Sequence, residues 1–128
     1  MRSRILFISG HPEDARKLAE MLHSLPLVLD HADGVRHARA QLQLHEYDAV
    51  LTEGALPDGN WLDVLHLVRE SPREMVVIVT DKQADTRLWA EVLNLGAYDL
   101  LTQPYYEPEV RRILSNACSR FESSMAVS

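Results

Sequence analysis

Short, unbroken apolar runs recur along this chain, and each is followed by a stretch whose apolar residues have helical spacing. The clearest run covers residues 75–80, where four consecutive valine and isoleucine side chains would crowd a helix but suit a buried strand. Further runs predict strands at 4–9, 27–31, 47–52 and 97–101. Unbroken runs are typical of strands covered on both faces, so the chain is predicted to form a parallel sheet.

Local signals place a helix after each strand. Pro12 suits the first position of a helix predicted over 12–24, and Pro108 is predicted to start the last helix. Asn60 and Asp63 have the spacing of a capping box, and Gly96 is placed to end a helix in a left-handed conformation. The residues predicted to face the core from the last four helices are Val35, Ala38, Leu42, Trp61, Val64, Leu65, Val68, Trp89, Val92, Leu93, Val110, Ile113, Leu114 and Ala117.

Five alternating strand and helix units predict an α/β fold with a single doubly wound, five-stranded parallel sheet and helices on both faces. The flavodoxin-like strand order 2-1-3-4-5 is a common solution for a chain of 128 residues. We expect one domain over 1–120, followed by a fraying polar tail at 121–128. Met1 and this short tail favour a stand-alone domain.

Composition excludes several classes of protein. A net charge of -6 would repel phosphate backbones, so direct nucleic-acid binding is disfavoured. No apolar run approaches the roughly 20 residues that span a bilayer, and the apolar N-terminal run is too short for a signal peptide, so we expect no membrane association. Cys118 is the only cysteine, which excludes an internal disulfide and fits a reducing compartment. We expect a cytoplasmic protein.

Polar residues follow the predicted strands where a doubly wound sheet places its ligand crevice. The order 2-1-3-4-5 would bring together the carboxyl ends of four strands, which carry Ser9, Gly10, Glu53, Thr80, Asp81 and Gln103. Glu53 needs the most explanation, because an apolar run ends on its carboxylate and then drops into a Pro/Gly turn. The simple alternative is that Glu53 is a solvated carboxylate that opens a loop.

Residues 4–118 resemble the receiver domain of two-component response regulators. The resemblance lies in motifs that occur in the same order and at similar intervals as in the family. They are Ile5-Leu-Phe-Ile followed by Pro12, Asp48-Ala-Val-Leu before Glu53, Leu56-Pro-Asp-Gly59, Val77-Ile-Val-Thr80, and Gly96-Ala-Tyr-Asp-Leu-Leu-Thr-Gln-Pro104. The resemblance also implies that the Gln103–Pro104 peptide bond is cis.

The resemblance implies a phosphotransfer site from which this sequence departs. The acidic pair that helps receivers bind Mg²⁺ falls on Ser9 and Gly10, and the phosphoacceptor aspartate falls on Glu53. The lysine of the family falls on Gln103, and only the hydroxyl residue, Thr80, matches. Receivers also carry, outside these site positions, an aromatic residue that rotates on activation, and this sequence has Leu100 at that position.

These departures predict a degenerate site, that is, a pseudo-receiver. Mg²⁺ demands near-ideal octahedral oxygen coordination, and two carboxylates are missing, so we expect no cofactor and lost or weak Mg²⁺ binding. The extra methylene of Glu53 moves its oxygen by roughly 1 Å, and a misplacement of this size can cost about 10²-fold in rate. Glu53 could partly mimic phosphoaspartate, or it could be an inert carboxylate paired with Gln103 and Thr80. Asp81 could restore one charge, but it does not occupy a ligand position of the family.

Two functions from different classes remain open. The first is a protein-interaction module that acts without phosphorylation and is not an enzyme. The alternative is a working phosphorelay receiver with weak or non-standard phosphorylation. By the resemblance, the surface of the fourth helix, fifth strand and fifth helix would bind a protein partner or a second copy. Its predicted outward residues are Leu88, Leu95, Tyr105, Tyr106, Arg111 and Arg112.

Other residue types give weaker signals. Trp61 and Trp89 are predicted to be core anchors, because they lie on helical apolar stripes. The six histidines show no i, i+4 helical pair and no cysteine partner, so no metal site is predicted from them.

Overall fold

The structure, a computed structural model, describes residues 3–82 and 86–127, with side chains described for 3–82 and 87–119. A five-stranded parallel sheet has the order β2-β1-β3-β6-β7, in agreement with the predicted order 2-1-3-4-5. Its strands are β1 (Ser3–Ile8), β2 (Leu27–Ala32), β3 (Ala49–Glu53), β6 (Val76–Asp81) and β7 (Asp99–Thr102). The predicted flavodoxin-like fold is confirmed.

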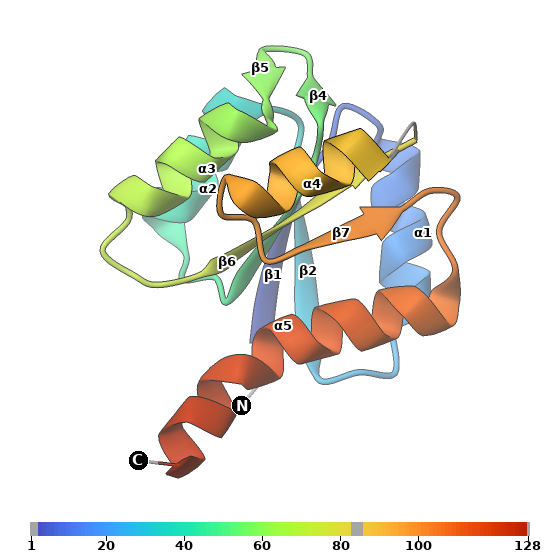
Figure 1. Ribbon diagram of the computed structural model, residues 1–128. Coiled ribbons are helices and arrows are strands. Elements are labelled where there is room, and N and C mark those ends of the chain that lie inside the picture. The colour runs from blue at the N-terminus through green and yellow to red at the C-terminus, as the bar shows by residue number, and fades with distance from the viewer. Residues whose placement is uncertain (1–2, 83–85, 128) are drawn as a thin grey trace.

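Helices cover both faces of this sheet (Figure 1). The helices α1 (Pro12–Leu22) and α5 (Glu107–Val127) cover one face, and their buried residues form one core with alternate strand residues such as Ile5 and Phe7. The helices α2 (Val35–Leu44), α3 (Trp61–Glu70) and α4 (Thr86–Asn94) cover the other face. Leu6 and Ile8 point to that side, because successive side chains of a strand alternate between faces.

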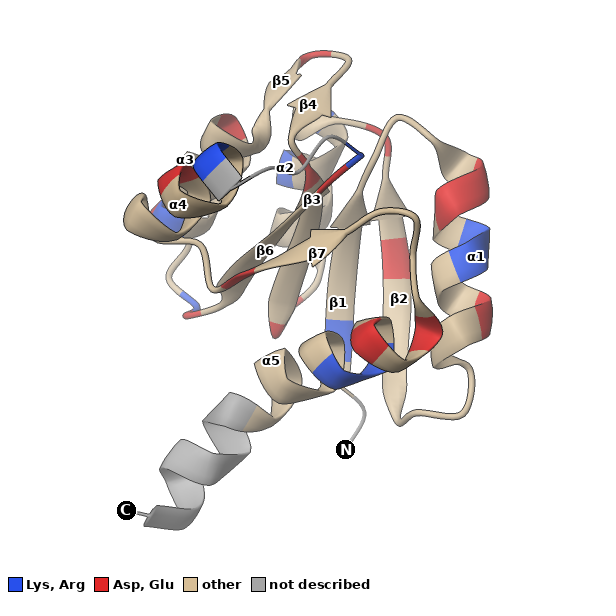
Figure 2. Cartoon of the chain, turned by 45° about the vertical axis from the view of Figure 1, so that its right-hand side comes forward, with Lys and Arg blue, Asp and Glu red and all other residues tan. Residues whose placement is uncertain are grey.

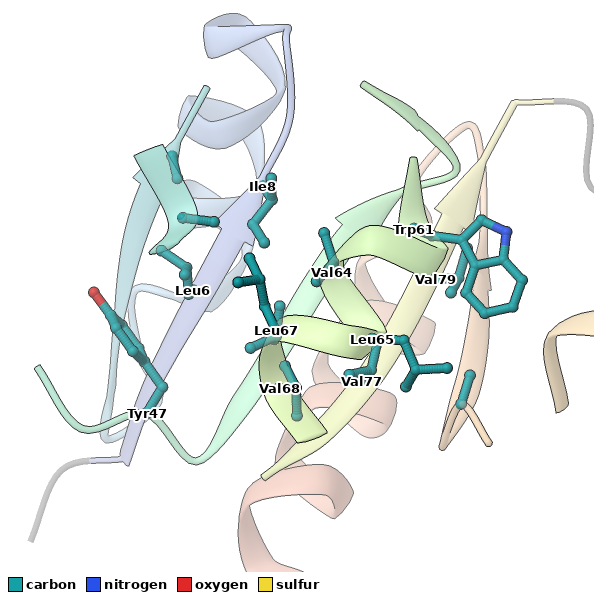
Figure 3. Close-up of a cluster of buried hydrophobic side chains, with 14 of the residues drawn as sticks. Leu6, Ile8, Tyr47, Trp61, Val64, Leu65, Leu67, Val68, Val77 and Val79 are labelled. Atoms are coloured by element: carbon teal, nitrogen blue, oxygen red, sulfur yellow. The ribbon is translucent and has the colours of Figure 1, made fainter. Parts of the chain in front are cut away.

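The core under α2, α3 and α4 fixes the position of β3 and β6 (Figure 3). Val64 and Val68 of α3 are buried in it together with Val77 and Val79 of β6. Tyr47 is fully buried at the amino-terminal end of the sheet, and its hydroxyl donates to Asp30 Oδ2 at 2.7 Å. The strand ends that carry the predicted site are therefore held by packed cores on both faces.

The predicted boundary signals are found in place. Helix α1 begins at Pro12, although it ends at residue 22 rather than 24. The capping box of α3 is complete, since Asn60 Oδ1 accepts from Leu62 N and Asp63 N while Asp63 Oδ2 accepts from Asn60 N. Gly96 has a φ of 111°, as expected for a left-handed helix end. The Gln103–Pro104 peptide bond is cis, which confirms the prediction.

The orientation of α4 differs from the predicted one. Trp89 and Leu93 are each 42% exposed, so Trp89 is not a core anchor. The buried side consists of Val92 and the half-buried Leu88, which packs against the core although it was predicted to face outward. The helix carries apolar residues on two sides, and the i, i+4 pair of Leu88 and Val92 is the side that meets the sheet.

Two features of the chain were not predicted. A short antiparallel hairpin of β4 (Ala55–Leu56) and β5 (Gly59–Asn60) follows β3, and Asp58 at its tip caps α2. The Asp58 carboxylate accepts from Val35 N at 2.7 Å and from Arg36 N at 3.0 Å, which lowers its pKa.

Helix α5 also continues to Val127, through most of the region where a fraying tail was predicted. No proline or glycine follows Pro108, so nothing in the sequence interrupts the helix. Residue 128 and the side chains of 120–127 lie outside the described part. No described helix is both long and apolar enough to cross a bilayer.

Candidate functional site

The carboxyl ends of three adjacent strands bring Ser9, Glu53 and Thr80 together. Ser9 follows β1, Glu53 ends β3, and Thr80 lies opposite Glu53 in the register of β3 and β6. All three side chains are buried. The predicted convergence of these strand ends is correct, and Glu53 is not the solvated carboxylate of the simple alternative.

Glu53 is held by two neighbours from the loop after β1. The Ser9 hydroxyl donates to Glu53 Oε1, and His11 Nδ1 lies 3.0 Å from Oε1 and 3.3 Å from Oε2. His11 N also donates to Ser9 Oγ at 2.9 Å, which fixes the hydroxyl between the loop and the carboxylate. The hydrogen bond and the charge of Glu53 raise the pKa of His11 above its usual value.

The amide of Gln103 pairs with Thr80 instead of Glu53. Gln103 Nε2 donates to Thr80 Oγ1 at 3.1 Å. Among the described residues, Ser9 and His11 form the hydrogen bonds to the carboxylate of Glu53. The prediction that an inert Glu53 pairs with Gln103 and Thr80 is therefore wrong about its partners. The reason is the backbone of the β1 loop, which places Ser9 and His11 directly over the tip of β3.

Two buried polar atoms beside this site have no hydrogen-bond partner in the part of the chain that the structure describes. They are Asp14 Oδ2, on the first turn of α1, and the hydroxyl of Tyr105. Both residues line one pocket together with Lys17, Lys82 and Gln103. Burial raises the pKa of Tyr105. The nearby Thr80 side chain opposes this rise, although it does not meet the geometry of a hydrogen bond to the Tyr105 hydroxyl, and the negative charges of Asp14 and Glu53 add to the rise.

Sequence reasoning missed Asp14 and His11. Ligand atoms of His11, Asp14 and Glu53 all lie within 4.8 Å of one another. Figure 2 shows acidic residues, in red, on the first turn of α1, beside the loops that follow the strands. The signal that could have found the cluster is the spacing of three between His11 and Asp14 across the start of a helix, where both side chains return toward the strand ends.

The remaining predicted pocket residues lie at the rim. Gly10 is exposed, and an added Cβ would lie 3.0 Å from Pro57 Cγ. The carboxylate of Asp81 lies against Gly54, at the end of β6, and is not part of the cluster around Asp14. Leu100 is buried in the core under α3 and α4.

The predicted partner surface is only partly exposed. Leu95 is 42% exposed, Tyr106 is 66% exposed, and Arg112 is also exposed. Tyr105 is half-buried and packs against the core beside α1. Arg111 is half-buried rather than free on the surface, because its guanidinium donates to Met21 O at 3.1 Å and Ser24 Oγ at 2.8 Å and so ties α5 to the end of α1.

Comparison with known proteins decides the family. A model of the response regulator receiver domain matches residues 5–115. This chain belongs to the response regulator receiver domain family. It is therefore a domain of two-component signalling, and the resemblance in its motifs is confirmed.

Individual relatives support the assignment. The response regulator protein PilR of Pseudomonas aeruginosa is 32% identical to this receiver domain in an alignment of 119 positions, and the match covers 91% of this chain and 26% of PilR. The transcriptional regulatory protein CitB of Klebsiella pneumoniae is 28% identical in an alignment of 124 positions, and the match covers 94% of this chain and 52% of CitB. The chain thus spans about a quarter to a half of the length of these curated relatives.

Solved structures show the same fold. The signal receiver domain of a protein described as a Luxo repressor from Vibrio parahaemolyticus superposes with a TM-score of 0.91 at 19% identity. The match covers 100% of this chain and 98% of that one.

The residues of this receiver domain do not fit the Mg²⁺ site that the family pattern implies. Position 9 offers a hydroxyl, position 10 offers no side chain, and Glu53 is engaged by Ser9 and His11. A further carboxylate close to Glu53 is that of Asp14, which comes from α1 and is grouped with the imidazole of His11. Such a mixed set does not provide the octahedral oxygen cage that Mg²⁺ prefers.

Proposed function

We propose that this receiver domain signals through protein contacts without being phosphorylated and has no catalytic activity of its own. The observation that carries the proposal is the arrangement around Glu53. Its carboxylate is bonded to Ser9 and His11, and the amide of Gln103 is bonded to Thr80 where the family pattern has a lysine.

The chemistry of phosphoryl transfer supports this proposal. Charge develops on the transferring group, and fixed cations that face it supply most of the stabilisation. Gln103 is neutral. His11 lies beside the carboxylate of Glu53, but its ring carries a positive charge only when it is protonated. A nucleophile that accepts two hydrogen bonds is also held back from attack, so we expect negligible Mg²⁺ binding and no acyl phosphate.

The test is treatment with Mg²⁺ and a small phosphodonor such as acetyl phosphate, followed by intact-mass measurement. We expect no added phosphoryl group on the wild-type domain or on the Glu53→Asp variant, because that substitution restores neither metal ligands nor the lysine. An active receiver domain treated in parallel is the positive control. Robust acyl-phosphate formation in Glu53→Asp would show that the loss at the other positions matters little.

Two observations support a second candidate function. Thr80 retains the hydroxyl of the family pattern, and Glu53 retains a carboxylate at the tip of β3. A working phosphorelay receiver with weak or non-standard phosphorylation would use these groups. A phosphorylated peptide containing Glu53 in the wild-type sample would favour this alternative.

We also propose the surface through which the domain acts, and we call it the α4–α5 face. It consists of the exposed residues Trp89, Leu93, Leu95, Tyr106 and Arg112. Aromatic and arginine side chains are enriched where interfaces gain most of their binding energy. A protein partner or a second copy of the chain would cover this face. The curated relatives include proteins described as transcriptional regulators, and we propose that the partner belongs to a pathway of that kind.

A further inference from the structure

The geometry points to a binding site for one divalent transition-metal ion of the Zn²⁺ class, formed by His11, Asp14 and Glu53. This site goes beyond the proposed function, which requires no ion. It also differs in ligands from the Mg²⁺ site of the family pattern, since His11 and Asp14 lie outside the positions of the acidic pair.

The first argument is the state of Asp14. Asp14 is only 8% exposed, and its Oδ2 has no hydrogen-bond partner among the described residues. A buried carboxylate that is neither paired nor hydrogen-bonded is costly, and buried charges in proteins are usually paired or coordinate a metal. Lys17 and Lys82 line the adjoining pocket, but neither forms an ion pair with Asp14 in the described part of the chain.

The second argument is the placement of the three ligand atoms. A ring nitrogen of His11 and one oxygen each of Asp14 and Glu53 lie within 4.8 Å of one another. Ligands at about 2.0 to 2.2 Å from a shared ion are separated by roughly 3 to 4.4 Å, so small rotations of the side chains suffice to bind one ion. His11 comes from the loop after β1, Asp14 from the first turn of α1 and Glu53 from β3, and both α1 and β3 are held by a packed core.

The surroundings resemble those of metal sites that keep an open position. Ser9 donates to Glu53 and accepts from His11 N, so it orients one ligand and the loop of another. The pocket lined by Asp14, Lys17 and Tyr105 gives access from solvent. Three protein ligands with a fourth position open to water or a small molecule is the arrangement of many zinc centres.

The ligand types select the class of metal. Imidazole suits Zn²⁺, Cu²⁺ and Ni²⁺, whereas Mg²⁺ and Ca²⁺ prefer cages made of oxygen atoms. An ion at this site would neutralise the two buried carboxylates. It would also link the loop after β1 to the tip of β3, so that occupancy changes the stability of the domain without any phosphoryl group.

Calorimetric titration of chelator-treated, tag-free protein with Zn²⁺ tests the site, with Co²⁺ absorption as a probe of coordination. We expect one ion per chain. Both His11→Gln and Asp14→Asn should weaken binding by at least about tenfold, the loss that removal of even a second-shell partner can cause. His11 is exposed, so His11→Gln keeps the test valid if Asp14→Asn folds poorly.

His66→Gln is the matched control, because His66 is exposed on α3 and lies outside the cluster. It should bind Zn²⁺ as the wild type does, and a large excess of Mg²⁺ should not displace the ion. The inference is overturned if Zn²⁺ does not bind at micromolar concentrations, or if His11→Gln binds it as tightly as wild type. Equal affinity for Mg²⁺ and Zn²⁺ would also overturn it.

Discussion

Glu53 lies buried at the tip of β3, and the residues around it explain how the chain tolerates this charge. A buried carboxylate without partners is costly, and here Ser9 and His11 provide hydrogen bonds from a single loop. The ring of His11 is partly solvent-exposed, with a side-chain exposure of 47%, so the pair is screened by water on one side. Its contribution to folding is therefore modest and depends on pH.

We expect His11 to titrate above the usual histidine value in an NMR titration with a chelator present, because Glu53 stabilises the protonated ring. Since the folded-state pKa is raised, the stabilisation is fully present below the unfolded-state pKa of 6.5 and is lost as the pH rises through the folded-state value. In Glu53→Gln the pKa of His11 should return toward 6.5. An unchanged value in that variant would assign the shift to another group.

Helix α3 begins at a complete capping box, and its buried side positions the end of β3 against β6. We expect Asn60→Ala to lower the free energy of unfolding by about 0.5 to 2 kcal/mol, because Leu62 N and Asp63 N lose their acceptor. Urea denaturation monitored by circular dichroism measures the change. Asn60→Ser retains a capping oxygen and should stay close to wild type, and an equal loss in both variants would mean that the cap is not the cause.

Strands could be predicted from the sequence more reliably than the orientation of the helices. The run at 75–80 has one reading, since consecutive β-branched residues suit only a buried strand, and β6 lies there. Helix α4 has two apolar sides, and spacing alone does not say which side meets the sheet. Trp89 and Leu93 were assigned to the core because they share an apolar stripe with Val92. Of these three only Val92 is buried, and Leu88 packs beside it.

The sequence predicted the residues of the site that lie at the ends of strands, but not the residue that comes from a helix. Ser9, Glu53, Thr80 and Gln103 converge as expected, because the alternation of strands and helices predicts a doubly wound sheet and the common strand order for such a sheet is the one found. Asp14 could not be found in this way, since an acidic residue in the first turn of a helix is ordinarily explained by the helix dipole and solvent. Its burial depends on the tertiary packing of α1 beside the residues after β7.

Across the molecule, exposed apolar side chains concentrate on the α4–α5 face, and this predicts association through it. We expect Leu95→Glu and Tyr106→Glu each to weaken self-association or partner capture while the fold stays intact. Leu100 is buried and is not aromatic, so phosphodonors should leave the association unchanged. Analytical ultracentrifugation and partner pull-down measure these effects.

Leu44→Glu is the matched control, because Leu44 is 73% exposed at the end of α2, outside the α4–α5 face. This variant should behave as the wild type does. The surface assignment is wrong if the wild-type domain stays monomeric at high concentration and both face variants capture the partner as well as it does.

The unequal burial of the two tryptophans gives the domain a pair of built-in optical probes. Trp61 is 5% exposed within the core under α3, whereas Trp89 is 42% exposed on α4. A collisional quencher such as iodide should reach the indole of Trp89 and spare that of Trp61. Protection of the quenchable fraction then reports coverage of α4 by a partner, while the unquenched emission reports the integrity of the core in the same unlabelled sample.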